Sequence, residues 1–152
     1  MRDKLIGALL VALQFALLAA LCVPVAGVLL AGGIAAGSWS WVPIMLGLAL
    51  GVWALTCNRP GNFNIRPTPR LGGQLVQSGP YRWVRHPMYS AVLLVAVGCA
   101  WVSASPWAVL ELALLAAVLT VKATLEERWM LTQHAGYAAY RLRTRRFIPG
   151  LF

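Results

Sequence analysis

The stretch Ser78–Tyr89 reads SGPYRWVRHPMY, and the interpretation of the remaining chain depends on it. It lies between long apolar runs and holds two arginines and one of the two histidines of the chain. Such a gathering of polar groups beside apolar helices indicates either a local function or an anchor at a membrane surface. The only adjacent acids, Glu126 and Glu127, follow one helical hairpin later. Two helices of similar length would bring both places to the same surface, where we expect one site.

The composition is typical of an integral membrane protein. Hydrophobic residues make up 60% of the 152 residues and charged residues 11%, whereas soluble domains carry roughly a quarter charged residues. The length fits one domain, 1–152. The net charge of +9 would suit nucleic acid, but the basic residues lie almost wholly outside the apolar runs. Their placement favours membrane topology and anionic lipid headgroups, and no nucleic-acid partner is expected.

Four apolar runs predict an all-α polytopic membrane protein with about four transmembrane helices and a short C-terminal amphipathic helix. Between and after them lie a loop at 58–88, rich in Gly, Pro and Asn, and a basic tail at 126–152. The loops at 32–41 and 103–105 contain no Lys or Arg, which places both termini in the cytoplasm. Size and composition suggest a bacterial inner membrane. The predicted spans cover about 5–31, 42–57, 89–103 and 106–125.

Local signals mark several helix boundaries. Pro24 offers a bend in the first span. Pro87 pushes His86 out of helical geometry and can begin the third span. Ser105 is a suitable N-cap, and Pro106 a suitable first residue, for the last span.

Glu126 and Glu127 are the first candidates for chemistry. Two carboxylates at the end of a membrane helix are costly unless they are partnered or hydrated. They can be a hydrated helix end, with Lys122 and Arg128 as ion partners. Alternatively, one acid accepts hydrogen bonds from a cationic or hydroxyl-bearing ligand, an interpretation that the scarcity of acids favours. Lys122 can snorkel to the membrane surface or hold a substrate anion.

Aromatic and imidazole groups surround the same place in the sequence. His86 would lie at a helix N-terminus, where exposed N–H groups favour hydrogen-bond acceptors. Tyr81 and Tyr89 can stack on a planar ring such as adenine or anchor the membrane interface. No metal site is expected, because the chain has two histidines and its three cysteines are far apart.

The order and spacing of these residues resemble the isoprenylcysteine carboxyl methyltransferase and phospholipid methyltransferase group. The resemblance covers about residues 66–150, whereas residues 1–57 resemble the family only in being membrane spans. The motifs that carry it are Ser78-Gly79-Pro80-Tyr81, Arg85-His86-Pro87-x-Tyr89, Glu126-Glu127 and Gly136-x-x-x-Tyr140.

The resemblance implies an integral membrane enzyme that uses S-adenosylmethionine without a Rossmann domain. Its cofactor pocket would lie on the cytoplasmic side and open to the bilayer between helices. Glu127 would hold the cofactor, with Glu126 beside it. The positions that match cofactor-binding residues of the family are Gly73, Gln74, Leu75, Val76, Tyr81, His86, Pro87, Met88, Tyr89 and Glu127.

The expected substrate is lipophilic, either an isoprenylcysteine-like carboxylate or another small lipid, with a phospholipid amine as the alternative. Methyl transfer from a sulfonium mostly needs aligned reactants and excluded water. An amine or hydroxyl acceptor would also need a base, for which Glu126 is the candidate, and Arg85 is the candidate for binding an anionic substrate group. The isoprenylcysteine branch has an arginine where this chain has Lys122, which supplies a point charge instead of a planar fork.

A non-catalytic four-helix membrane protein, such as a small transporter, is the rival class. A transporter should place polar groups near the middle of the membrane, whereas here they gather at one face. A lipid-binding scaffold that has the pocket without the chemistry is a further alternative.

Overall fold

The computed structural model describes residues 2–32, 38–58 and 74–151, and within them the fold is all-α, as predicted. The described residues contain no strand, only one isolated bridge between Val84 and Arg145. Short 3-10 turns precede α2 and α3, at Ser38–Ser40 and Gly79–Arg82. The α-helices of the described ranges are α1 (Arg2–Leu30), α2 (Trp41–Cys57), α3 (Pro87–Ser103), α4 (Pro106–Gln133) and α5 (Tyr137–Arg143).

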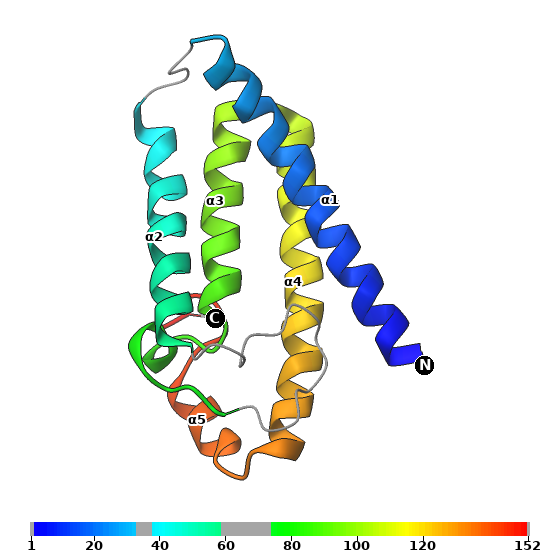
Figure 1. Ribbon diagram of the computed structural model, residues 1–152, viewed down its shortest axis with the longest axis vertical. Helices are drawn as coiled ribbons and strands as arrows, with labels where there is room; N and C mark the ends of the chain where they lie inside the picture. Colours follow the sequence, from blue (N-terminus) through cyan, green and yellow to red (C-terminus); the bar gives the residue numbers. More distant parts are fainter. Residues whose placement is uncertain (1, 33–37, 59–73, 152) are drawn as a thin grey trace.

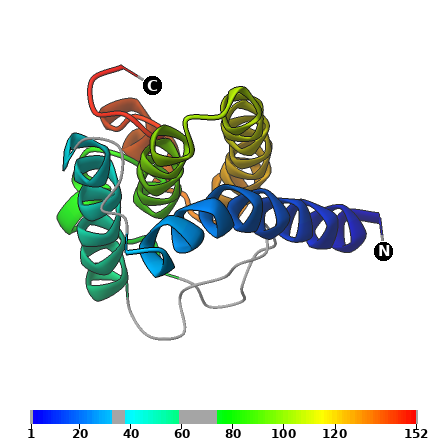
Figure 2. The same ribbon diagram turned by 90° about the horizontal axis from the view of Figure 1, so that it is seen from above.

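Helix α3 is the centre of the bundle. It packs between α2 and α4, and α1 crosses diagonally over α3 and α4 (Figures 1 and 2). The start of α1 lies toward the same end of the bundle as α5 (Figure 1). The main core joins α1, α3 and α4, with Leu21, Ala96, Leu115 and Leu119 fully buried. We call the end with α5 the basic end, because the arginines described below gather there.

Helices α2 and α3 pack closely because α2 carries glycine at the contact. A Cβ atom on Gly47 would lie 2.7 Å from the main-chain oxygen of Ala91 and 2.8 Å from Cγ2 of Val95. These distances are shorter than a non-bonded contact, so a side chain at Gly47 would push the helices apart. This contact fixes α2 against the helix that begins at the site.

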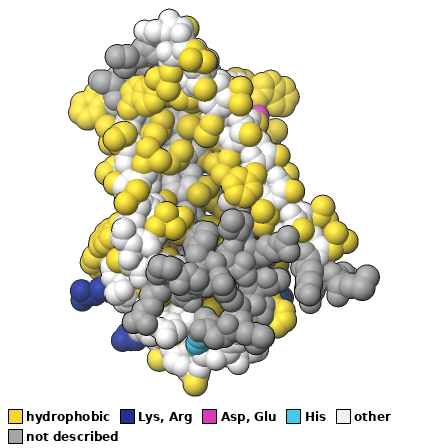
Figure 3. Space-filling model, in the orientation of Figure 1, with side chains coloured by type: hydrophobic (Ala, Val, Ile, Leu, Met, Phe, Trp, Pro, Cys, Tyr) yellow, Lys and Arg dark blue, Asp and Glu magenta, His cyan; other side chains and the backbone are white. Residues whose placement is uncertain are grey.

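Two helices are long and apolar enough to cross a membrane, α1 over Leu5–Leu30 and α4 over Pro106–Gln133. Helices α2 and α3 are apolar but have 17 residues each, so length and composition do not confirm the predicted count of four spans. Hydrophobic side chains cover much of the bundle on the face shown in Figure 3, and the visible Lys and Arg side chains lie toward the basic end. A 28-residue helix such as α4 is about 42 Å long at 1.5 Å per residue. It is therefore longer than a hydrocarbon core of about 30 Å.

The predicted starts of α3 and α4 are confirmed. Pro87 is the first residue of α3, and His86 is its N-cap, outside helical geometry. Pro106 is the first residue of α4, and the hydroxyl oxygen of Ser105 accepts a hydrogen bond from the Trp107 N–H at 3.3 Å. Helix α1 continues through Pro24 without interruption.

Candidate functional site

The candidate site lies at the basic end, where the start of α3, the second half of α4 and the C-terminal segment meet. The C-terminal segment runs beside residues 83–86 as a short parallel bridge. Its main-chain bonds are Arg85 N–H to the Arg145 carbonyl at 2.8 Å, His86 N–H to the Arg146 carbonyl at 3.1 Å, and Arg145 N–H to the Trp83 carbonyl at 2.9 Å. This pairing holds two arginines of the tail beside Arg85 and His86.

Glu127 is the centre of an ionic cluster and is 2% exposed. A carboxylate offers about four lone-pair positions, and four hydrogen bonds from three side chains converge on this one. They come from Arg85 Nε at 2.9 Å, His86 Nε2 at 3.2 Å, and Arg146 Nε and Nη2 at 3.2 and 3.1 Å. Arg141 adds an ion pair at 3.7 Å. The acceptor capacity of Glu127 is therefore taken up within the protein.

Arg85 ties the same cluster to the tail. Its Nε bonds Glu127, and its Nη1 donates to the main-chain oxygens of Thr144 and, at 3.2 Å, Arg141. A guanidinium is planar and holds its N–H donors in fixed directions, so one arginine can bond a carboxylate on one side and two carbonyls on the other. The structure thus places Arg85 in the cluster, with three of its bonds directed at α4 and the C-terminal segment.

His86 lies between the two acids. Its Nε2 is 3.2 Å from Glu127 and its Nδ1 is 3.4 Å from Glu126. Burial alone lowers the pKa of His86, but hydrogen bonds to both carboxylates outweigh burial and raise the pKa above its ordinary 6.5. A neutral imidazole can donate from only one nitrogen, so two facing carboxylates favour the imidazolium.

Glu126 has a different environment from its neighbour. Its Oε1 accepts a hydrogen bond from the Tyr89 hydroxyl, and its side chain is 23% exposed. The Tyr89 ring stacks on His86, with centroids 5.4 Å apart and planes 5° apart. Glu126 therefore keeps acceptor positions that the described contacts do not use, beside two parallel rings.

Lys122 connects the Tyr89 ring to α1. It is 1% exposed, donates to the Gln14 side-chain oxygen at 2.5 Å, and lies 5.1 Å above the Tyr89 ring centroid. The expectation that Lys122 snorkels to the surface is wrong, because Gln14 of α1 holds its ammonium inside the bundle. Glu126 is one turn further along the same face of α4.

Two tyrosines join the loop before α3 to α5. The Tyr140 hydroxyl donates to the Tyr81 carbonyl at 2.7 Å. Burial, with the nearby Cys57 and Glu126, raises the pKa of Tyr81 to about 12, and burial also raises the pKa of Tyr140. Both hydroxyls therefore stay protonated at neutral pH, and that of Tyr140 acts as a hydrogen-bond donor.

The structure brings together six of the residues proposed from the sequence: Arg85, His86, Tyr89, Lys122, Glu126 and Glu127. Pro87 is buried at the start of α3 and Met88 is half-buried beside it. Gln74, Leu75 and Val76 form a segment outside helices that leads to Gln77. Gly73 lies outside the described residues. The predicted roles of these residues in binding and catalysis stay predictions.

Sequence reasoning missed two features of the site. Arg146 supplies two of the four bonds to Glu127, and no local pattern singles it out among the arginines of the tail. Gln14 did carry a signal, because it is the sole amide or charged side chain between residues 5 and 31. Isolated polar groups in a membrane helix usually face a partner inside the bundle.

These features define a class: a helical membrane protein with an ionic and aromatic site at one end of its bundle. A family model described as phospholipid methyltransferase matches residues 34–136, which is more than half of the chain. The chain belongs to the phospholipid methyltransferase family, and the predicted family is confirmed. The apolar helices and the family together indicate an integral membrane protein and a methyltransferase. Searches of curated proteins and of solved structures found no match.

Proposed function

We propose that the protein is an S-adenosylmethionine-dependent methyltransferase that acts on a lipophilic substrate at the cytoplasmic membrane face. The observation that carries the proposal is the junction of Glu126, Tyr89 and His86 at one end of an apolar bundle whose family is one of methyltransferases. When bound, S-adenosylmethionine supplies an electrophilic methyl group on its sulfonium.

The donor and acceptor set of the site fits this cofactor. The cofactor carries an ammonium and ribose hydroxyls that need acceptors, and Glu126 has acceptor capacity to spare. Its adenine is planar, and Tyr81 offers an aromatic ring near the site, whereas the Tyr89 ring already contacts His86 and Lys122. The segment Gln74–Val76 has main-chain groups outside any helix or strand. The geometry favours Glu126 over Glu127 for direct contact, because the acceptor positions of Glu127 are already used.

The residues of the cluster then have separate tasks. Glu127 and Arg85 fix the C-terminal segment against the start of α3, and so position His86 and Tyr89. Glu126 would take the proton released by an amine or hydroxyl acceptor, with the Tyr89 hydroxyl orienting it. Lys122, buried with a neutral amide as its hydrogen-bond partner, would hold an anionic group of the substrate. Both an isoprenylcysteine-like carboxylate and a phospholipid carry such a group.

The membrane arrangement that we propose has four spans with the basic end in the cytoplasm. A 17-residue helix is about 26 Å long, which is at the lower limit for crossing. The arginines of the basic end satisfy the positive-inside rule. A lipophilic substrate could then reach Glu126 and Lys122 from the bilayer without leaving it.

Isothermal titration calorimetry tests the proposal on the full chain in detergent with lipid restored. The ligands are S-adenosylmethionine and S-adenosylhomocysteine, and the variants are Glu126→Gln and the control Glu111→Gln. A hydrogen bond to a charged group contributes about 1.5–3 kcal/mol, so Glu126→Gln should bind about 10- to 100-fold more weakly. The Glu111 variant should bind as the parent protein does.

Each outcome has a definite meaning. Absence of binding in folded protein would overturn the methyltransferase proposal and favour a lipid-binding protein without chemistry. If Glu126→Gln binds the cofactor as tightly as the parent protein, Glu126 does not hold the cofactor, although cofactor binding itself is established. Transfer of labelled methyl from the cofactor to an added lipid extract would then identify the acceptor class.

A further inference from the structure

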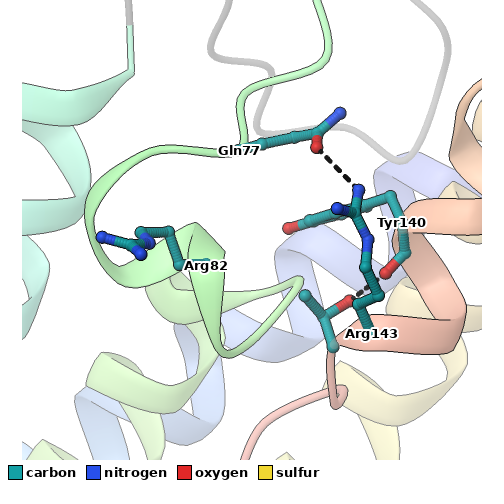
Figure 4. Close-up of a pocket in the computed structure, with 5 residues that line it drawn as sticks. Gln77, Arg82, Tyr140 and Arg143 are labelled. Carbon is teal, nitrogen blue, oxygen red and sulfur yellow. Dashed lines mark hydrogen bonds between the residues drawn. The ribbon is translucent and has the colours of Figure 1, made fainter.

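A separate pocket lies between α5 and the segment that precedes α3. It has a volume of about 180 Å³ and is lined by Gln77, Arg82, Tyr140, Arg143 and Thr144. Figure 4 shows Gln77, Tyr140 and Arg143 gathered on one side and Arg82 on the other. The last three lining residues lie beyond the range 34–136 that matches the family. The pocket is therefore partly built by a segment outside that match.

The pocket has an excess of cationic donors. Arg143 Nη2 donates to the Gln77 side-chain oxygen at 3.2 Å, which holds the guanidinium in place and leaves its other N–H groups available. The hydroxyl protons of Tyr140 and Thr144 point elsewhere, to the carbonyls of Tyr81 and Tyr140. No carboxylate is among the described lining residues. This chemistry selects an oxyanion.

Exposed apolar residues place the pocket at the depth of lipid headgroups. Trp83 directly follows Arg82, is 51% exposed and packs on Trp53 with ring centroids 5.8 Å apart. Exposed tryptophans at helix ends are typical of the membrane interface. Leu142, next to Arg143, is 83% exposed. Each arginine of the pocket thus has an exposed apolar neighbour, a pattern that suits the boundary between headgroups and acyl chains.

We propose that this pocket binds the phosphate group of an anionic phospholipid headgroup. Arg143, held by Gln77, supplies a guanidinium fork for the phosphate oxygens. Arg82 extends outward from the opposite wall (Figure 4), and because its side chain is exposed it reaches the phosphate by a change of rotamer. The acyl chains pass the exposed Trp83 and Leu142.

The pocket suits a headgroup better than a whole cofactor. Pockets for drug-sized ligands and cofactors usually measure about 300–1,000 Å³, and this one is smaller. Thr144 also separates it from the Glu127 cluster, because its carbonyl faces Arg85 while its side chain lines the pocket. The lipid site is therefore distinct from the site proposed for methyl transfer and does not depend on it.

Native mass spectrometry of the full chain tests the proposal. The detergent-purified protein is equilibrated with mixed micelles that contain phosphatidylglycerol and phosphatidylcholine in equal amounts, and bound lipid is counted. The charge-preserving variant Arg82→Lys/Arg143→Lys removes both forks and keeps the net charge. The control, Arg128→Gln, removes one exposed charge of α4 outside the pocket. Melting curves confirm that each variant is folded.

The expected result is preferential retention of one phosphatidylglycerol, weakened about tenfold or more in the double lysine variant. A surface arginine attracts anionic lipid by about 1 kcal/mol, so Arg128→Gln should weaken binding no more than about fivefold. If the double lysine variant binds phosphatidylglycerol as the parent does, the lipid is attracted by net positive charge alone and the proposal is overturned. Added S-adenosylhomocysteine or inorganic phosphate should not displace the lipid. Displacement by either would reassign the pocket to a soluble ligand.

Discussion

Replacing Glu127 by glutamine should strongly destabilise the fold, because it leaves Arg85 and Arg146 without their carboxylate and His86 with only Glu126. The side chains of Arg85 and Arg146 are 10% and 18% exposed, and that of His86 is 10% exposed. Removing one partner of a buried ion pair usually costs about 3–5 kcal/mol. Glutamine keeps one acceptor oxygen, and Arg85 keeps its bonds to the carbonyls of the tail. We therefore expect a loss of about 3 kcal/mol in the free energy of unfolding.

The pH dependence provides a second measure of the same cluster. The raised pKa of His86 means that the folded state binds its proton more tightly than the unfolded state does. The charged form thus contributes stability that is fully present below the ordinary pKa of 6.5. That contribution is lost as pH rises through the raised pKa. Glu127→Gln removes one of the two carboxylates that cause the shift, so its stability should fall less steeply with pH.

Equilibrium unfolding in mixed micelles of increasing dodecyl sulfate content measures both quantities by tryptophan fluorescence. The comparison runs between about pH 6 and about pH 9, where a histidine with a raised pKa titrates. Glu111→Gln is the matched control, since it removes an acid from the same helix away from the cluster, and it should change stability by less than about 0.5 kcal/mol. The reasoning is refuted if Glu127→Gln is as stable as this control and has the parent pH profile.

Three further substitutions separate structure from binding. Lys122→Met should change stability little, because removal of a buried cation offsets the loss of the donor to the buried Gln14 oxygen, but it should abolish methyl transfer to an anionic lipid in a labelled-methyl assay. Gly47→Ala should lower the free energy of unfolding by about 1–3 kcal/mol in dodecyl sulfate, since its Cβ would lie 2.7 Å from a main-chain oxygen of α3. The control Gly136→Ala should be neutral, because a Cβ there meets nothing within 4 Å. Tyr140→Phe should cost about 1 kcal/mol in the same measurement, because the Tyr81 carbonyl loses its donor.

Local signals were sufficient to predict where helices begin and that two distant motifs meet. Pro87 and Pro106 each occupy the first helical residue, as their fixed φ requires. The apolar runs before and after the turn at Ala104, at 89–103 and 106–125, run in opposite directions, so Glu126 was expected to return to the end of the bundle where Tyr89 lies. The hydrogen bond between these two side chains confirms that their meeting could be read from spacing.

The path of the C-terminal segment could not be predicted in the same way. Its pairing with residues 83–86 consists of three main-chain hydrogen bonds, and main-chain groups carry no sequence signature. The choice of Arg146 as the main partner of Glu127 depends on that register. Two equally basic residues lie nearby but bind differently. Arg141 makes only a longer ion pair with Glu127, and Arg143 donates to Gln77. Register here is set by tertiary packing, including burial of Phe147 against the rings of His86 and Tyr89.

The two adjacent acids show why a motif underdetermines a site. Successive residues on an α-helix point about 100° apart, so Glu126 and Glu127 face different neighbours although the sequence presents them as a pair. Glu127 faces the tail and is surrounded by arginine and histidine donors, whereas Glu126 shares the face of Lys122 and meets the Tyr89 hydroxyl. A carboxylate whose positions are all taken can hold the fold together but has little left for a ligand. The neighbour with open positions is the one that a cofactor or a methyl acceptor can reach, and an assay that replaces the two acids one at a time distinguishes the anchor from the reactive group.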